Sequence, residues 1–235
     1  MNAWKPKRFW QAATPEACEG GYTVRLDGRP VKTPARAPLV LPTQALAAAI
    51  AAEWDAQEKE VRPETMPATR TANSAIDKVN RHFAEVAEMI AEYGGSDLLC
   101  YRAEGPAALV ERQAAAWDPL LHWTAERFGA PLRPTSGVMP VAQPEPSLAA
   151  LSAAVRAQSP FELAALHDLV AITGSLVLGL AIAERRLAPL EGFALSRIDE
   201  HWQIEQWGAD EQAAEIEAIK RQALLDAAQF YGLCR

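Results

Sequence analysis

The sequence contains few cysteines, and none is spaced for a metal site or a redox pair. Its 235 residues include three, Cys18, Cys100 and Cys234, which lie far apart in the chain. An odd number of thiols cannot pair completely, and no Cys-x-x-Cys string is present. The pattern excludes a disulfide-rich scaffold and a zinc ribbon, and it predicts free thiols in a reducing compartment.

Long hydrophobic runs are also missing. The longest apolar stretch, Leu169–Ala183, is fifteen residues long and is interrupted by Thr173-Gly174-Ser175 and by Gly179. A membrane-spanning helix needs about 20 apolar residues. The segment is therefore predicted to be a buried core helix, and the N-terminus has no apolar segment typical of a secretory signal.

Motifs for phosphate binding or nucleophilic catalysis are missing too. The chain has no Gly-rich phosphate loop and no Gly-x-Ser-x-Gly elbow, and Gly20-Gly21 and Gly94-Gly95 are isolated pairs that predict turns. Cys100 follows two leucines, which favours a buried, inert thiol. His167 and Asp168 are neighbours on a predicted helix, so they point about 100° apart and are not expected to form a dyad.

The remaining candidate for chemistry is a cluster of acidic residues and one histidine. His201 and Glu205 are four residues apart on a predicted helix, beside Asp199 and Glu200. Two ligands at this spacing can begin a metal site, but a catalytic site needs further ligands, and a solvated acidic face is the favoured interpretation. We therefore predict no metal, no catalytic residues and no enzymatic activity.

Charge is unevenly distributed along the chain, whose formal net charge is −7. Residues 1–75 carry ten Lys or Arg against eight Asp or Glu, whereas residues 76–235 carry thirteen against twenty-two. The acidic larger part repels phosphate groups, so nucleic acid is not expected as a partner.

The first third of the sequence has the signals of short strands and turns. Tyr22–Leu26 alternates apolar and polar residues, and Asp27-Gly28 after it is a strong hairpin signal. Residues 29–34 and 38–42 are predicted to be further short extended pieces. Thr43 is predicted to cap the first helix.

Helical periodicity dominates the rest of the chain, with proline and glycine between the segments. The predicted helices cover residues 76–93, 106–117, 119–128, 148–157, 160–186 with a kink at Gly174, 190–207 and 210–231. We therefore predict an α+β protein with a small β-rich N-terminal domain with one helix, residues 1–75, and a larger α-helical C-terminal domain, residues 76–235.

Seven tryptophans are present, most of them beside charged residues. Tryptophan is enriched at protein–protein hot spots, but it also fills seams inside folds. The spacing of Trp54, Trp117 and Trp123 with aliphatic residues favours the structural role. For Trp202 and Trp207, on the acidic helix, both interpretations remain open.

An ordered set of short strings resembles the assembly chaperones specific for the alpha subunit of F1-ATP synthase, the family of the mitochondrial F1 assembly factor and its bacterial homologues. The strings extend over almost the whole chain, and their order makes the resemblance specific. They are Lys7–Trp10, Gly21-Tyr22, Leu26–Pro34, Glu53–Gln57, Met66-Pro67, Thr69-Arg70, Asn73, Asp97–Arg102, Trp117–Leu121, Gly174–Leu178, Asp199-Glu200, Gln203, Glu205 and Trp207-Gly208.

The resemblance implies a role and a set of site residues. It implies an orthogonal helical C-terminal domain and a chaperone that binds the free alpha subunit, preventing its aggregation until the beta subunit joins, with no cofactor or nucleotide. Glu200 is the first candidate for client binding, facing a basic or polar patch, and its alternative is an ordinary surface charge. The wider candidate set is Asp199, Glu205, Trp202, Trp207, Arg29 and Lys32, whereas Trp54, Asp55 and Trp117 are expected to be interdomain or structural.

Two other classes of function remain as alternatives. One is a helical adaptor with a different client, and the other is a small-molecule enzyme of unknown type. Because the chain lacks the N-terminal extension of mitochondrial relatives, we expect a bacterial cytoplasmic protein.

Overall fold

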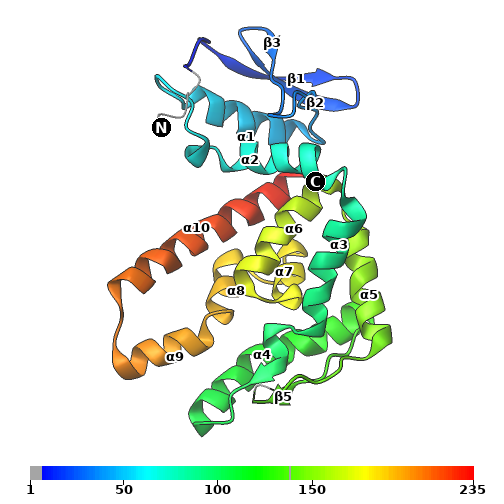
Figure 1. Ribbon diagram of the computed structural model, residues 1–235, viewed down its shortest axis with the longest axis vertical. Coiled ribbons are helices and arrows are strands. Elements are labelled where there is room, and N and C mark those ends of the chain that lie inside the picture. Colours follow the sequence, from blue (N-terminus) through cyan, green and yellow to red (C-terminus); the bar gives the residue numbers. More distant parts are fainter. Residues whose placement is uncertain (1–6, 138) are drawn as a thin grey trace. The chain divides into compact units, whose positions relative to one another are not determined.

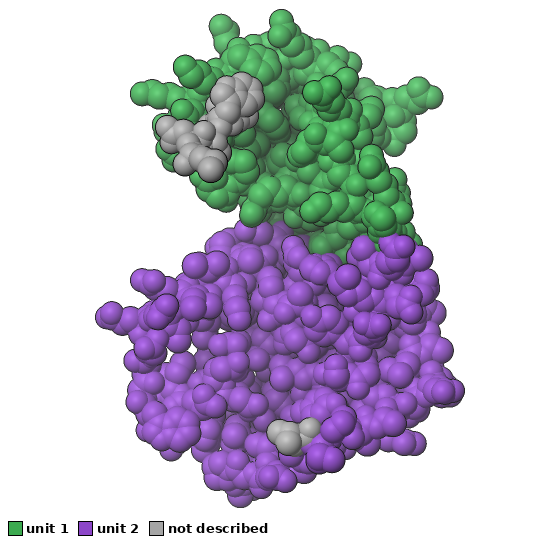
Figure 2. Space-filling model, in the orientation of Figure 1, with its two compact units in different colours: residues 1–83, 159–165, 229–235 green, residues 84–158, 166–228 purple. Residues whose placement is uncertain are grey.

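The computed structural model describes residues 7–137 and 139–235 (Figure 1). Two compact units make up the chain (Figure 2). Unit 1 contains the N-terminal part through Phe83 together with Ser159–Ala165 and Gln229–Arg235, and unit 2 contains Ala84–Gln158 and Leu166–Ala228. Unit 1 thus extends beyond residue 75, where the sequence predicts a boundary, and it includes two segments from far along the chain.

The sheet of unit 1 is antiparallel and has the strand order β1-β2-β3. Its strands are β1 (Ala13–Cys18), β2 (Gly21–Leu26) and β3 (Arg29–Pro30). β1 pairs with β2 along its whole length. Gly21 must be glycine, because a Cβ atom there would lie 2.3 Å from the Leu41 carbonyl oxygen.

The hairpin predicted at Asp27-Gly28 is confirmed. Leu26 pairs with Arg29 across the turn, and both turn residues have a positive φ, 46° for Asp27 and 80° for Gly28. Asp27 is suited to this conformation because its carboxylate accepts hydrogen bonds from the backbone N–H groups of Gln11 and Ala12. The same bonds lower the pKa of Asp27. The extended piece predicted over residues 38–42 forms only isolated bridges, at Pro38 and Leu41.

Two helices of unit 1 are joined by a carboxylate. Thr43 caps α1 (Gln44–Asp55) as predicted, accepting a hydrogen bond from the Leu46 N–H. Near the end of α1, Glu53 accepts hydrogen bonds from the N–H groups of Ala68 and Thr69 at 2.7 and 2.8 Å. It therefore satisfies free donors in the first turn of α2 (Pro67–Ser74), a helix that the sequence pattern does not predict.

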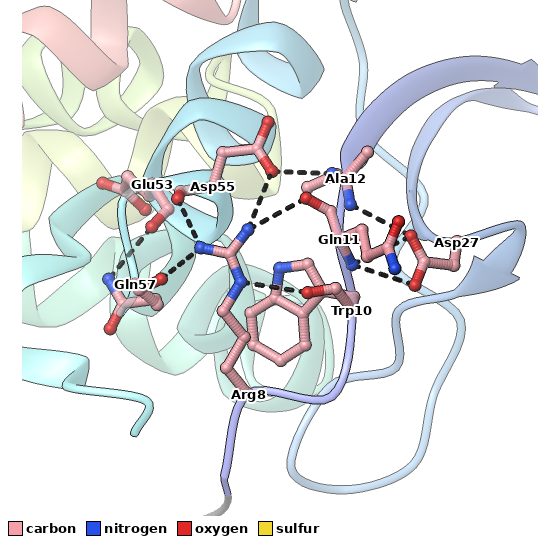
Figure 3. A network of polar contacts seen from close by, with 9 residues as sticks. Arg8, Trp10, Gln11, Ala12, Asp27, Glu53, Asp55 and Gln57 are labelled. Atoms are coloured by element: carbon pink, nitrogen blue, oxygen red, sulfur yellow. Dashed lines mark hydrogen bonds and ion pairs between the residues drawn. The ribbon is translucent and has the colours of Figure 1, made fainter. Parts of the chain in front are cut away.

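The N-terminal segment is held by a guanidinium group (Figure 3). Arg8 donates hydrogen bonds to the carbonyl oxygens of Trp10, Gln11, Asp55 and Gln57. The Asp55 carboxylate accepts from the N–H of Ala13 at 2.8 Å, at the start of β1. Asp55 thus joins the end of α1 to the sheet, and the Trp54 ring packs edge-on against Trp10 with 5.2 Å between ring centroids.

Unit 2 is mainly helical. Its principal helices are α3 (Phe83–Glu92, whose first residue belongs to unit 1), α4 (Ala107–Phe128), α5 (Glu145–Arg156), α7 (Leu176–Ala183), α8 (Pro189–Leu195) and α9 (Ile198–Trp207). The helices α6 (Pro160–Thr173) and α10 (Glu211–Leu233) contribute residues to both units. The short strands β4 (Tyr101–Arg102) and β5 (Thr135–Ser136) pair in parallel. Every residue of α7 is buried, so α7 forms the centre of this unit.

Three predicted helix boundaries differ in the structure. Pro119 lies inside the single helix α4, because buried Trp117 and Leu120 on either side hold the helix continuous despite one lost backbone hydrogen bond. The predicted helix over 160–186 is divided at Gly174, which has a φ of 69°. The predicted helix over 190–207 is divided at Ser196, whose hydroxyl donates to the Phe193 carbonyl and competes with helical bonding.

A buried carboxylate organises the break between α6 and α7. Asp97 accepts hydrogen bonds from the Ser175 hydroxyl at 2.7 Å and from the N–H groups of Leu99 and Val177, each at 3.0 Å. Ser175 in turn caps α7 by accepting from the Leu178 N–H. Burial raises the pKa of Asp97, and the three hydrogen bonds oppose that rise. Asp97 therefore connects two distant segments at the first turn of the central helix.

The Trp117 indole is buried and donates a hydrogen bond of 2.9 Å to the Leu195 carbonyl, so it joins α4 to α8.

The Cys100 thiol is buried as predicted, and burial raises its pKa to about 12. No helix within the described residues is long and apolar enough to cross a membrane.

We expect Asp97→Asn to lower the free energy of unfolding by about 2 kcal/mol, because the amide keeps the shape of the side chain but leaves one buried donor without an acceptor. Urea unfolding followed by circular dichroism measures this change. Asp118→Asn is the matched control, since Asp118 pairs with Arg102 at a half-exposed position and should cost less than about 1 kcal/mol. Equal losses in the two variants would contradict the role assigned to Asp97.

Candidate protein-binding surface

The helix α9 contains five of the predicted site residues, and the structure gives each a different environment. Asp199, in the first turn, is half-buried and accepts a hydrogen bond of 2.6 Å from the side chain of Gln113 on α4. Gln113 is fully buried and also accepts from the Ala103 N–H. The Asp199 side chain is therefore directed at the interior, where its hydrogen bond joins the start of α9 to α4.

Glu205 and Trp202 form a second contact between α9 and α4. The Arg112 guanidinium donates two hydrogen bonds to the Glu205 carboxylate, at 2.7 and 3.0 Å. It also lies over the Trp202 ring, 4.9 Å from the ring centroid. The hydrogen bond from Arg112 lowers the pKa of Glu205, so the carboxylate is charged at neutral pH. These side chains set the orientation of α9.

Glu200 lies in a chain of charged side chains that connects α9 with α10. Arg197 donates a hydrogen bond to Glu200, and its Nε atom is 3.9 Å from a carboxylate oxygen of Glu217. Glu217 also contacts the Nε2 atom of His201 at 3.0 Å. Glu217 is less exposed than Glu200, whose side chain remains 41% exposed, so Glu200 has an oxygen surface left for another molecule.

A groove of about 510 Å³ lies between α9 and α10, and Glu200 lies along it. Trp207 also lines this groove and is 79% exposed. Ile204, at 38% exposure, is a further lining residue on α9. The α10 wall is formed by small residues and charges, among them Ala214 and Arg221.

The first part of α10 leaves its apolar side chains exposed. From Glu211 to Ala223 only Glu217 is even half-buried, although this stretch includes two isoleucines and several alanines. Ile216 is 48% and Ile219 is 70% exposed. Trp207 and Ile204 in the groove, and Ile216 and Ile219 outside its lining, are exposed apolar side chains that no element within the described chain covers. They lie on α9 and the first half of α10 (orange in Figure 1).

The sequence reasoning missed part of this surface. It predicts α10 as an amphipathic helix, but it does not single out Ile216, Ile219, Arg197 or Glu217. The available signal is weak, because an amphipathic pattern looks the same whether its apolar face is covered by the fold or left open.

The other predicted residues lie elsewhere. Arg29 and Lys32 belong to unit 1, where both are exposed and the Arg29 guanidinium lies 5.9 Å from the centroid of the Phe9 ring. His201 and Glu205, considered as two ligands of a metal site, have separate partners, Glu217 and Arg112. Across residues 7–137 and 139–235, no group of three or more His, Cys, Asp and Glu is arranged to hold a metal ion.

One prediction about possible chemistry is wrong. His167 and Asp168 do contact each other, with 2.9 Å between the His167 Nδ1 atom and an Asp168 carboxylate oxygen. The side chains are long enough to bend together although their Cα–Cβ bonds diverge. The hydrogen bond raises the pKa of His167, and both side chains are more than two-fifths exposed, as in a surface ion pair.

Exposed apolar side chains on two neighbouring helices, beside a partly open carboxylate, are characteristic of a surface that binds another polypeptide. Comparison with known proteins defines the class further. The model of the family described as ATP12 chaperone protein matches residues 7–125. The chain belongs to this family, and it is a chaperone of F1-ATPase assembly.

Individual relatives agree over nearly the whole chain. The crystal structure of Atp12 from Paracoccus denitrificans is 50% identical, with a TM-score of 0.95 over 97% of this chain and 98% of that one. An aspartate-to-lysine mutant of that protein matches equally well. A crystal structure from Agrobacterium tumefaciens is 43% identical, with a TM-score of 0.94 over 98% of this chain and 87% of that one. Mitochondrial atp12 of Schizosaccharomyces pombe is 25% identical over 224 residues, which are 90% of this chain and 77% of that protein.

We expect Arg112→Gln to loosen α9, because it removes both hydrogen bonds to Glu205 and the cation above Trp202. Hydrogen–deuterium exchange should become faster in residues 198–207 while the helix α7 remains protected. Arg127→Gln is the matched control, since Arg127 makes a similar two-bond contact with Glu184 from the same helix α4. Faster exchange of residues 198–207 in the control as well, or in neither variant, would contradict this assignment.

Proposed function

We propose that this chain binds the free alpha subunit of F1-ATPase through the groove between α9 and α10 and prevents its aggregation until the beta subunit joins. The observation that carries the proposal is the exposed apolar area of this groove, which includes Trp207 and Ile204. An unassembled subunit exposes apolar area that is destined for its neighbour, and such patches associate nonspecifically. A chaperone can prevent this by covering the patch with an apolar surface of its own.

Release requires that the contact be reversible, and the groove has suitable chemistry. Apolar residues supply area, whereas Glu200 offers a partly solvated carboxylate at the edge. Charges at the edge of an interface favour correct encounter more than they increase affinity. Glu200 would face a basic or polar patch on the alpha subunit, and the beta subunit could then displace the chaperone by covering the same area.

The proposed activity is binding rather than catalysis, and it needs no cofactor or nucleotide. The net negative charge of residues 76–235 suits a protein client and not a nucleic acid. Since the relatives from Paracoccus and Agrobacterium are far more similar to this chain than the yeast mitochondrial one, we propose that it acts in a bacterial cytoplasm.

Glu200→Lys should abolish the effect of the chaperone on its client, because a cation replaces the carboxylate at the edge of the groove. The measurement is the yield of soluble alpha subunit after co-expression without the beta subunit, and the wild-type chain should raise it. The melting temperature of the variant should stay within a few degrees of wild type, since a half-exposed ion pair contributes little to stability. Glu215→Lys makes the same charge change at an exposed position of α10 outside the groove, and it should retain activity. An active Glu200→Lys chain would refute the role of Glu200.

Trp207→Ser should weaken binding of the alpha subunit without unfolding the chaperone, because the lost indole is 79% exposed in the free chain. Pull-down of alpha subunit from cells depleted of beta subunit measures the effect, and a loss of at least tenfold is expected for an aromatic hot spot, which is worth about 2 kcal/mol. Leu190→Ser, at a 55% exposed position of α8, controls for the general loss of surface hydrophobicity. Equal recovery with both variants would place the contact elsewhere.

A further inference from the structure

Unit 1 contains a cavity that the role of α9 and α10 does not use. Its volume is about 530 Å³, within the range of pockets that bind small ligands or side chains. The walls come from the end of α1, from residues 61–66, from α2 and the π-helical segment Ala75–Val79 after it, and from the loop that begins at Lys32. The apolar part of the lining includes Pro34, Val61 and Met66.

Two buried polar atoms in residues lining this cavity have no hydrogen-bond partner. They are the Nε1 atom of Trp54, a donor, and the Oδ1 atom of Asn73, an acceptor. An unpaired buried group of this kind costs free energy and is uncommon in folded proteins. The Trp10 Nε1 atom, which lies outside the cavity lining, also has no hydrogen-bond partner, whereas nearby Gln57 uses both ends of its amide in hydrogen bonds.

The edge of the cavity is positively charged. Lys32, Arg70 and Lys78 are exposed, and in the part of the chain that the structure describes none of them takes part in an ion pair. The one carboxylate in the lining, Asp77, accepts hydrogen bonds from the Thr33 hydroxyl at 2.7 Å and the Ala35 N–H at 3.0 Å. The cations therefore remain available to an acidic group of another molecule.

We propose that this cavity is a second docking site, which binds an extended polypeptide segment of a partner with an apolar residue close to an acidic one. A peptide group carries one acceptor and one donor, so one segment can accept from Trp54 and donate to Asn73. Its apolar side chain fills the cavity, and its carboxylate meets the cations at the edge. The ring of Trp54 supports the fold against Trp10, but its N–H group serves the partner.

The test uses full-length protein labelled with ¹⁵N and a pool of acetylated, amidated hexapeptides with Leu at the second position, Glu at the fourth and random residues elsewhere. The indole N–H resonance of Trp54, identified by its loss in Trp54→Phe, should shift saturably with this pool and much less with a pool that has Lys in place of Glu. No shift, or equal shifts with both pools, would overturn the proposal. So would the same shift with acetate alone, which indicates a simple anion site, or a shift on concentrating the protein alone, which indicates self-association.

Two pairs of variants test the named contacts. Asn73→Leu should leave the melting temperature unchanged or raise it, because it removes an unpaired buried group, while peptide affinity falls about tenfold. A lower melting temperature would mean that Asn73 bonds within the fold, and would overturn the proposal. Arg70→Glu should weaken peptide binding at low salt, and Arg81→Glu, an exposed position of unit 1 outside the cavity, should not. Equal effects of the two reversals would count against the site.

These peptides contain no sequence of the alpha subunit, and the variants lie outside the groove between α9 and α10. A negative result would therefore leave the proposed function intact, and failure of the proposed function would leave this docking site to be judged separately.

Discussion

The structure of unit 2 depends on the buried carboxylate of Asp97, which lies against the first turn of α7. Asp97 accepts hydrogen bonds from Ser175, Val177 and Leu99 at a site that water does not reach. Ionising a carboxyl group inside a protein is costly, and three donors offset that cost only in this geometry. The result is a fixed break between α6 and α7 and a fully buried central helix. The helices α4 and α8 pack against α7, so the position of α9 depends indirectly on the same carboxylate.

The surface of α9 and α10 combines rigid attachment with open apolar area. Asp199 and Glu205 secure α9 to α4, and the contacts of Glu217 join α9 to α10. These polar contacts fix the positions of α9 and α10. Trp207 and the isoleucines of α10 can therefore stay exposed while the two helices keep their arrangement. A preorganised surface loses little conformational freedom when a client binds, which favours binding that is fast and still reversible.

Unit 1 depends on a different polar centre. Arg8 donates hydrogen bonds to four carbonyl oxygens, and Asp55 joins the end of α1 to the first strand. These contacts connect the N-terminal segment and the sheet to the end of α1. These bonds use nearly every polar group near the end of α1. The N–H groups of Trp10 and Trp54 and the amide oxygen of Asn73 are exceptions. Trp54 and Asn73 line a cavity with unpaired cations at its edge, which is why this part of unit 1 has the properties of a binding site.

The sequence by itself determined the elements whose signals are local. The Asp27-Gly28 turn, the Thr43 cap, the buried segment around Cys100 and the ordered strings of the chaperone family all follow from neighbouring residues. Tertiary structure alone decided the continuity of α4 through Pro119, the pairing of Asp97 with Ser175, and the inward direction of Asp199. The physical reason is that each of these depends on packing or hydrogen bonding with residues far away in the sequence. The exposure of Ile219 was decided in the same way, since an apolar helix face is a core or a docking surface according to what else the fold places upon it.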